Sequence, residues 1–117
     1  MGAKSTFDEA DAEGLALLLE DEFIPFDGMV FRRSQFDSSR VAERLRTESR
    51  RQVQSETNHV HLVLYVGDPS TQRSWGARLC RRWKERLKTT FPDVNTHVVL
   101  EELDGDVVVT VFATEGG

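Results

Sequence analysis

The stretch VHLVLYVGDP, residues 60–69, decides the fold that we expect for this chain. Its first seven residues form a nearly continuous apolar run, which is typical of a strand buried on both faces of a sheet. Gly67 then allows a turn, Asp68 suits the N-cap of a helix, and Pro69 suits its first position, where the missing N–H costs nothing. The sequence therefore predicts that residues 60–66 form the central strand of a sheet and lead directly into a helix.

The helix that follows Pro69 is expected to pack on the sheet with one side and to face solvent with the other. Its apolar residues occupy one arc of a helical wheel: Trp75, Leu79, Cys80, Trp83 and Leu87. Basic residues cover the opposite side: Arg73, Arg78, Arg81, Arg82, Lys84 and Lys88. Phe91-Pro92 is expected to end the helix, because proline cannot donate the hydrogen bond that a helix interior needs.

Two Asp-Gly dipeptides predict two β-hairpins with tight turns. They are Asp27-Gly28, between residues 23–26 and 29–32, and Asp104-Gly105, between residues 94–103 and 106–113. Asp-Gly favours the type I′ turn, which requires a positive φ at both central residues. Pro25 cannot donate a hydrogen bond to a neighbouring strand, so the first strand is expected at an edge or to be very short.

Two further helices are expected before residue 60. Ser5 and Thr6 suit the cap of a helix over residues 7–22, whose apolar residues recur at helical spacing. The acidic run over residues 20–22 opposes the helix dipole at the C-terminal end, which indicates solvent exposure there or a basic partner. The second helix, over residues 37–55, has a thin apolar stripe and many arginines, so we expect it at the surface.

Together these elements predict a single α/β domain over residues 1–117, a layered structure with a mixed β-sheet and three helices. Residues 1–36 are expected to form the acidic helix and a hairpin, and residues 37–113 an α-β-α-β-β core. The strand, helix and strand over residues 59–103 suit a right-handed β-α-β crossover with parallel strands. The last hairpin then adds an antiparallel neighbour to that sheet.

Charge is distributed unevenly along the chain, which carries 15 Lys and Arg against 20 Asp and Glu. Residues 1–31 have a net charge of −7, residues 32–88 of +8, and residues 89–117 of −6. Such a chain presents separate surfaces of opposite sign, since surface charges act over about 10 Å at 0.1 M salt. With one cysteine and neither a transmembrane stretch nor an apolar signal sequence, we expect a cytoplasmic protein.

Four segments of the chain form a series of helix, strand, helix and strand pair: VAERL, VHLVLYVGD, ARLCRRWK and THVVLEELDGDVVVTVFATEGG. This series, within residues 41–117, resembles the TPM-domain family in order and hydrophobic texture. Ala77, Leu79, Trp83 and residues 98–100 carry most of the match. The resemblance implies an α/β/α sandwich. It also implies the acid phosphatase activity and divalent-metal binding at acidic loops that are associated with some members of that family.

Three carboxylates are candidate ligands for such a metal. Asp104 and Asp106 flank the glycine of the second turn, and Asp68 follows the predicted central strand, where open α/β sheets tend to place ligands. A cation held by these residues would activate water and polarise a phosphoryl oxygen. Turn and cap preferences account for the same three residues without any cation, so both interpretations stay open.

Motifs of high catalytic specificity are absent from the sequence, which has no nucleophile elbow, P-loop, dinucleotide fingerprint or paired-cysteine zinc site. This absence favours a binding protein without a cofactor over an enzyme. Three histidines form a separate candidate zinc site if their strands are neighbours: His59, His61 and His97.

The arginine-rich helix faces are the remaining functional signal, because guanidinium groups bind carboxylates and phosphates in a bidentate manner. We therefore predict a small interaction or assembly module that binds an acidic protein partner or a second copy of itself. The candidate binding residues are Arg40, Arg44, Arg51, Arg73, Arg78, Arg81, Arg82 and Lys88. The first alternative is the metal-assisted, phosphatase-like enzyme, and the second is a protein that binds nucleic acid or another polyanion.

Overall fold

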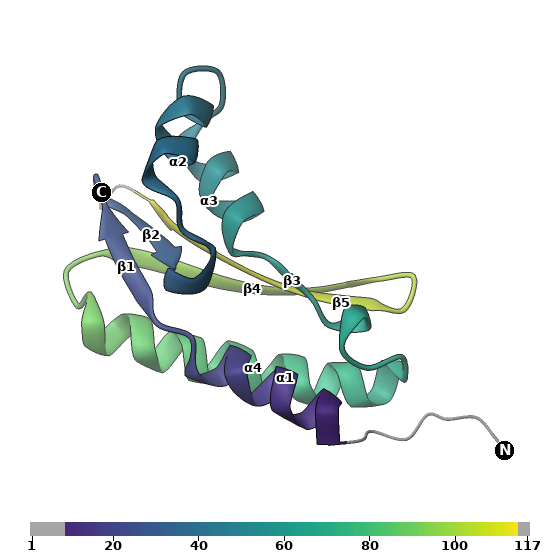
Figure 1. Cartoon of the computed structure of the whole chain (residues 1–117). Helices are drawn as coiled ribbons and strands as arrows, with labels where there is room; N and C mark the ends of the chain where they lie inside the picture. The colour runs from purple at the N-terminus through teal and green to yellow at the C-terminus, as the bar shows by residue number, and fades with distance from the viewer. Residues whose placement is uncertain (1–8, 115–117) are drawn as a thin grey trace, which may run out of the picture.

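The computed structural model describes residues 9–114 of the chain (Figure 1). Its helices are α1 (Glu9–Glu20), α2 (Ser38–Arg44), α3 (Arg50–Asn58) and α4 (Pro69–Thr90), with 3₁₀ turns η1 (Arg33–Gln35) and η2 (Leu62–Leu64). Its strands are β1 (Phe23–Phe26), β2 (Met29–Arg32), β3 (Val60–His61), β4 (Asn95–Leu103) and β5 (Asp106–Thr114). The mixture of helices and strands confirms the α/β class. The expected cap residues Ser5 and Thr6 lie outside the described residues.

The central strand of the three-stranded sheet is β5, and the prediction that residues 60–66 form it is wrong. The strand order is β3-β5-β4, and only Val60 and His61 of the apolar run are a strand. The chain then turns through η2, where Leu62 is buried while Val63 and Leu64 are 43% and 79% exposed. A short apolar run does not distinguish a buried strand from a turn whose side chains are only partly buried.

All strand pairs among residues 9–114 are antiparallel, so the predicted mixed sheet is also wrong. β3 and β4 do run in the same direction, as expected for the two ends of a β-α-β unit. However, β5 lies between them and pairs with both. The final hairpin therefore does not extend the sheet at an edge but inserts its second strand into the middle.

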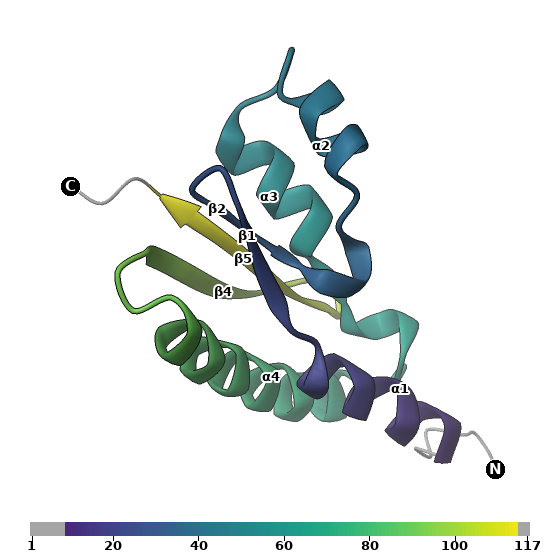
Figure 2. The same cartoon turned by 60° about the vertical axis from the view of Figure 1, so that its left-hand side comes forward.

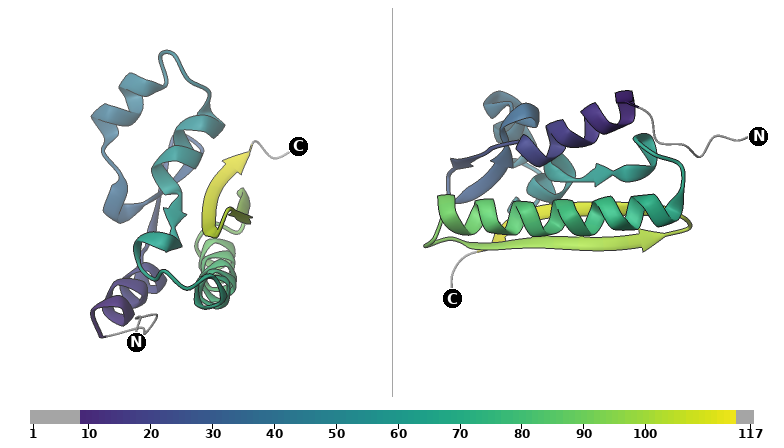
Figure 3. Two further views of the ribbon diagram at one scale, coloured as in Figure 1. Left: turned by 90° about the vertical axis from the view of Figure 1, so that its right-hand side faces the viewer. Right: turned by 90° about the horizontal axis from the view of Figure 1, so that it is seen from below.

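Helices lie on both sides of the strands (Figure 2). α4 runs along β4 and β5 with α1 packed against it, while α3 lies on the other side and carries α2 beyond it (Figure 3). The larger core cluster includes Leu15, Trp83 and Val109, so the N-terminal helix contributes to the same core as the later elements. None of the helices described is both long enough and apolar enough to cross a membrane.

The predicted helix over residues 37–55 is divided into α2 and α3, which gives four α-helices in the described part instead of three. Asp37 caps α2 by accepting from the Arg40 N–H, and Ser49 caps α3 by accepting from the Gln52 N–H. The new start at Ser49 allows α3 to run in a different direction from α2. As a result, Val41 of α2 and Val53 of α3 lie in the same small core cluster.

β1 and β2 form a separate two-stranded sheet, and β2 is not hydrogen-bonded to β5 as a strand. Two buried amides of α3 join this sheet to the three-stranded one. The Gln54 carbonyl oxygen accepts from the N–H groups of Val30 and Ala113, and its amide donates to the Ala113 carbonyl. Asn58, one turn later, donates to the carbonyls of Val30 and Val111. Both side chains are fully buried, so α3 takes the place of a strand between β2 and β5.

Both predicted Asp-Gly turns are confirmed. Asp27 and Asp104 have φ values of 53° and 52°, and Gly28 and Gly105 both have a φ of 80°. Each turn joins two strands in antiparallel register. These positive values are the backbone conformation that a type I′ turn requires.

Candidate functional site

The helix α4 has the bounds that the sequence predicts, because its first residues are fixed by a strong cap. Asp68 Oδ2 accepts from the Thr71 N–H at 2.8 Å and from the Thr71 hydroxyl at 2.7 Å. These two hydrogen bonds lower the pKa of Asp68. The helix continues until Phe91, so the predicted boundary at Phe91-Pro92 is confirmed.

One side of α4 lies tightly against the sheet through five buried residues: Gln72, Gly76, Leu79, Trp83 and Leu87. A Cβ atom at Gly76 would lie 2.9 Å from Val107 Cγ1 and 3.0 Å from Leu100 Cδ1, so the absence of a side chain sets the approach of the helix. Gln72 accepts from the Val107 N–H and thereby satisfies a backbone donor at the edge of β5. This packing fixes which residues of α4 face outward.

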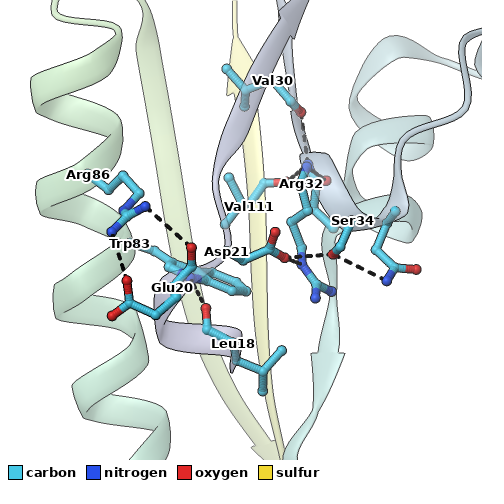
Figure 4. A network of polar contacts seen from close by, with 11 residues as sticks. Leu18, Glu20, Asp21, Val30, Arg32, Ser34, Trp83, Arg86 and Val111 are labelled. Carbon is cyan, nitrogen blue, oxygen red and sulfur yellow. Dashed lines mark hydrogen bonds and ion pairs between the residues drawn. The ribbon is translucent and has the colours of Figure 1, made fainter. Parts of the chain in front are cut away.

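The neighbouring helix α1 ends against α4, which supplies the donors that its last carbonyls lack. Trp83 Nε1 donates to the Leu18 carbonyl at 2.9 Å, and Arg82 and Arg86 donate to the carbonyls of Leu19 and Glu20 at 3.4 Å (Figure 4 draws the Trp83 and Arg86 contacts). The Glu20 carboxylate also lies 3.9 Å from both guanidinium groups. The basic partner expected for the acidic end of this helix is therefore α4 of the same chain.

Asp21, the residue that follows α1, forms a buried ion pair (Figure 4). Arg32 Nε donates to Asp21 Oδ2 at 2.7 Å, and the two side chains are only 8% and 6% exposed. The Ser34 hydroxyl donates to the same oxygen, and the Arg32 guanidinium lies 5.5 Å from the centre of the Trp83 ring. Arg32 is thus part of the structural core and is not available to an external ligand.

The predicted binding residues on α4 fall into two groups. Arg73 forms a bidentate pair with Glu102, Arg82 lies beside Glu20, and Arg78 stacks over Trp75 at 4.7 Å. Arg81 and Lys88 are exposed and form no ion pair with any residue in the range 9–114, and Lys84 between them shares this property. The outer face of α4 therefore carries three cations without a counter-ion: Arg81, Lys84 and Lys88.

The predicted binding residues before residue 60 lie elsewhere. Arg44 pairs with Glu48 and Glu56, which raises the pKa of its guanidinium through hydrogen bonds and charge attraction. Arg51 lies 4.3 Å from the centre of the Phe112 ring, and Arg40 is exposed on α2. Because α2 and α3 lie across the strands from α4, the eight predicted residues do not form one surface (Figure 2).

A groove of about 370 Å³ lies between α4 and β4. Its lining residues are Ala77, Cys80, Arg81, Lys84, Glu85 and Leu100. The Leu100 side chain is 42% exposed, and its Cδ1 atom lies against Gly76 of α4, so part of this side chain is available to a ligand in the groove. Lys84 and Leu100 were not assigned to the site from the sequence. Residues 81, 84 and 88 are three and four positions apart and therefore lie on one face of the helix, and this spacing is the sequence feature that could have placed Lys84 in the site.

The candidate metal ligands do not come together. The Asp68 carboxylate caps α4, and Asp104 lies in the exposed turn. Asp106 Oδ2 forms a hydrogen bond with His61 Nδ1 at 2.7 Å. Within residues 9–114, no group of three or more His, Cys, Asp or Glu side chains is arranged to hold a metal ion.

Of the three histidines, the structure brings two together. The rings of His59 and His61 lie edge to face with centres 4.8 Å apart. His97 pairs with Phe112 of β5 and stacks on its ring, whereas His61 pairs with Val108 of β5. Phe112 and Val108 are four residues apart along the strand, which is a separation of about 13 Å. β3 and β4 are not neighbours in the sheet, so the condition for a three-histidine zinc site is not met among the described residues.

Comparisons with known proteins identify no relative: no family model, no curated protein and no solved structure matches the chain. The TPM-domain resemblance therefore stays a hypothesis, and the functional argument depends on the geometry of this chain alone.

Proposed function

We propose that this protein is an interaction module that binds an acidic protein partner through the outer face of α4. The observation that carries the proposal is the presence of three exposed cations without counter-ions, Arg81, Lys84 and Lys88, beside a groove with an apolar part. Carboxylates of a partner would neutralise these cations, while apolar side chains of the same partner would cover the groove.

The charge of α4 supports this proposal. The helix contains seven basic residues and one acidic residue, Glu85, which is a net charge of +6. Like charges three and four residues apart on a helix destabilise it by about 0.2–0.5 kcal/mol per pair. At other positions the chain places acids beside its arginines, as at Arg44 of α2 and at Arg73 near the start of α4. The uncompensated part of α4 is the surface where an external anion would gain most.

A protein partner fits this surface better than nucleic acid does. Binding of single strands usually combines cations with exposed aromatic rings on which bases stack. Trp83 is fully buried, and the ring of Trp75 is covered by Arg78. Nucleic acid is therefore an outcome that the test must distinguish.

The test is an NMR titration of the labelled protein with a short poly-glutamate peptide and, separately, with a single-stranded oligonucleotide. We expect the peptide to shift the amide signals of residues 77–88 and to bind more weakly as salt rises. The triple variant with Arg81→Glu, Lys84→Glu and Lys88→Glu should lose this response.

A matched control carries the same change of net charge on other surfaces, through Arg33→Glu, Arg40→Glu and Arg46→Glu, all at exposed positions. This variant should bind the peptide nearly as well as the parent protein. Equal loss in both variants would show that only the net charge matters and would contradict the proposal. Preference for the oligonucleotide would replace the acidic protein by nucleic acid.

A further inference from the structure

The long strand β4 has a free edge beside the proposed binding surface. β4 spans nine residues and is the last strand of the order β3-β5-β4, so within residues 9–114 only one of its two edges is paired. Free edges present unpaired N–H and C=O groups and are templates for another strand. This edge is therefore a second feature, independent of charge, that points to a ligand.

The register identifies the backbone groups that lie on the free edge. Leu103 and Asp106 flank the two-residue turn and form a hydrogen-bonded pair, so alternate residues of β4 point toward β5. The residues between them direct their N–H and C=O groups outward: Thr96, Val98, Leu100 and Glu102. The same alternation on β5 is observed directly, since Val107, Val111 and Ala113 make their hydrogen bonds on the side away from β4.

Most of this edge lacks the features that protect an edge strand from pairing. Residues 95–103 contain no proline and no glycine, and the strand pairs with β5 in continuous register. Charge is confined to one end, where Glu101 and Glu102 lie. Glu102 is held by Arg73. From Thr96 to Leu100 the outward backbone groups pair with no strand within the described part, although the Cys80 thiol donates a long hydrogen bond to the Val98 carbonyl.

The groove beside this edge has an apolar end and a basic end. Cys80 Sγ lies 3.9 Å from the Val98 carbonyl, and Gly76 lies against Leu100. α4 and β4 run in opposite directions, with about 1.5 Å per residue in the helix and about 3.3 Å in the strand. Lys84 is therefore level with Thr96, and Lys88 is level with Val94, at the end away from the hairpin turn.

We infer that the acidic partner binds as an added β-strand on the free edge of β4. On the side of the added strand that faces α4, the side chains opposite Val98 and Leu100 are apolar. Those opposite Val94 and Thr96 are acidic, because they lie next to Lys88 and Lys84. This inference rests on the proposed function and specifies the conformation of the partner. In such complexes main-chain hydrogen bonds supply affinity, and alternate side chains supply specificity.

A second copy of the chain fits the same edge less well. Pairing of β4 with β4 around a two-fold axis would place two α4 helices on one face of the joined sheet. Each helix carries a net charge of +6, so the two would repel one another. An acidic strand meets no such repulsion, and it is the occupant that charge complementarity favours.

The test uses two synthetic peptides of identical composition, TKVTVTETE and TKVTVETET. In antiparallel pairing the first peptide places its valines and glutamates on the α4 side, whereas the second turns both glutamates to the opposite side. We expect the first to bind about tenfold more tightly, with NMR shifts in β4 and in α4. The preference should disappear in the Lys84→Glu variant.

Two measurements test strand addition itself. N-methylation of the central valine of the first peptide removes an N–H that faces β4, and binding should be lost. Thr96→Pro removes an outward N–H of β4 without breaking a bond to β5, so it should weaken binding while Thr96→Ala does not. The peptide modification keeps the test valid if the proline variant folds poorly.

The outcomes separate this inference from the proposed function. Equal binding of both peptides, still dependent on Lys84, would overturn strand addition but leave an acidic partner on α4. Failure of both peptides while poly-glutamate still binds to α4 has the same meaning. Failure of all three acidic peptides would overturn both proposals. A dimer in sedimentation experiments that Thr96→Pro dissociates would identify a second copy as the occupant and overturn the inference.

Discussion

The two hairpins of this protein have the same turn but different edges. In the first, Pro25 lies on the outer edge of β1, where it offers no N–H, and the amides of Gln54 and Asn58 occupy the edge of β2. In the second, β3 and the side chains of α3 and α4 cover the edge of β5, whereas the edge of β4 pairs with no strand among the described residues and is contacted by the Cys80 thiol at the Val98 carbonyl. Within residues 9–114, three of the four hairpin edges are therefore covered, and one is largely open.

The turns themselves differ in the same way. Arg50 donates to Asp27 Oδ2 at 3.0 Å and to the Asp27 carbonyl, so the first turn is attached to α3. In the second turn, apart from its chain neighbours, no described residue lies within 4 Å of the position that a Cβ atom at Gly105 would take. An identical local signal therefore produced one turn that is attached to α3 and one turn that has open space around its glycine within the described part.

The largest expected effect on stability comes from Gln54→Leu, which removes the amide that covers the β2 edge of the first hairpin. This change leaves the buried N–H groups of Val30 and Ala113 without an acceptor, and we expect it to lower the free energy of unfolding by about 3–5 kcal/mol. Chemical denaturation measures the change. Gln52→Leu, at an exposed position of the same helix, is the control and should change stability by less than about 0.5 kcal/mol. A small effect at Gln54 would show that the amide bridge is not essential.

The next effect compares the two turns directly through Gly28→Ala and Gly105→Ala. Both glycines have a φ of 80°, so each substitution should cost about 1–2 kcal/mol. At Gly28 the new Cβ would also lie 3.0 Å from Arg50 Nη2 and displace it, whereas at Gly105 it would contact no other residue of the described range. Gly28→Ala should therefore be the more destabilising change in urea unfolding. The reverse order would contradict the attachment of the first turn to α3.

A smaller effect is expected from the ion pair that holds the first turn. Its side chains are 42% and 72% exposed, so a double-mutant cycle with Arg50→Gln and Asp27→Asn should give a coupling of about 0.5 kcal/mol. Asparagine tolerates the positive φ at this position, so the backbone is preserved. The coupling should decrease in high salt. A coupling that salt does not change would indicate that the Asp27 carbonyl, and not its carboxylate, binds Arg50.

The smallest effect concerns the ion pair that Arg73 of α4 forms with Glu102 of the second hairpin. The Arg73 guanidinium lowers the pKa of Glu102 through its hydrogen bonds and its charge. The stabilising effect of this carboxylate is present above its ordinary pKa of 4.5 and is lost as the pH falls through the lower folded value. Urea unfolding from pH 6 to pH 3 should show a shallower loss of stability for Glu102→Gln than for the parent protein. Glu101→Gln is the control, and its curve should follow that of the parent.

The sequence predicts those parts of the fold that depend on a few adjacent residues. Both Asp-Gly turns and the Asp68 cap are confirmed, because backbone sterics and one local hydrogen bond determine them. The position of residues 60–66 could not be predicted, because it depends on which strand pairs with Val60, and that partner is 49 residues away at Val109. The roles of Gln54 and Asn58 were missed for the same reason, since polar residues on a helix ordinarily indicate solvent.

The candidate site shows the same division. The cations of α4 are evident in the sequence, because the helical wheel separates them from the apolar arc. Their separation from Arg40, Arg44 and Arg51 depends on which side of the strands each helix occupies, which no local pattern encodes. The groove at Leu100 depends on the strand order, so it was visible only in three dimensions.

The central position of β5 has a consequence for synthesis of the chain on the ribosome. Gln54, Asn58 and Gln72 find their partners on β5 at sequence separations of 59, 53 and 35 residues. Until residues 106–114 have left the exit tunnel, the amides of Gln54 and Asn58 lack three of their seven hydrogen bonds, and β3 lacks the strand with which it pairs. The domain is therefore expected to fold late and in one step after translation of β5, and nascent chains that stop before residue 106 should remain sensitive to protease.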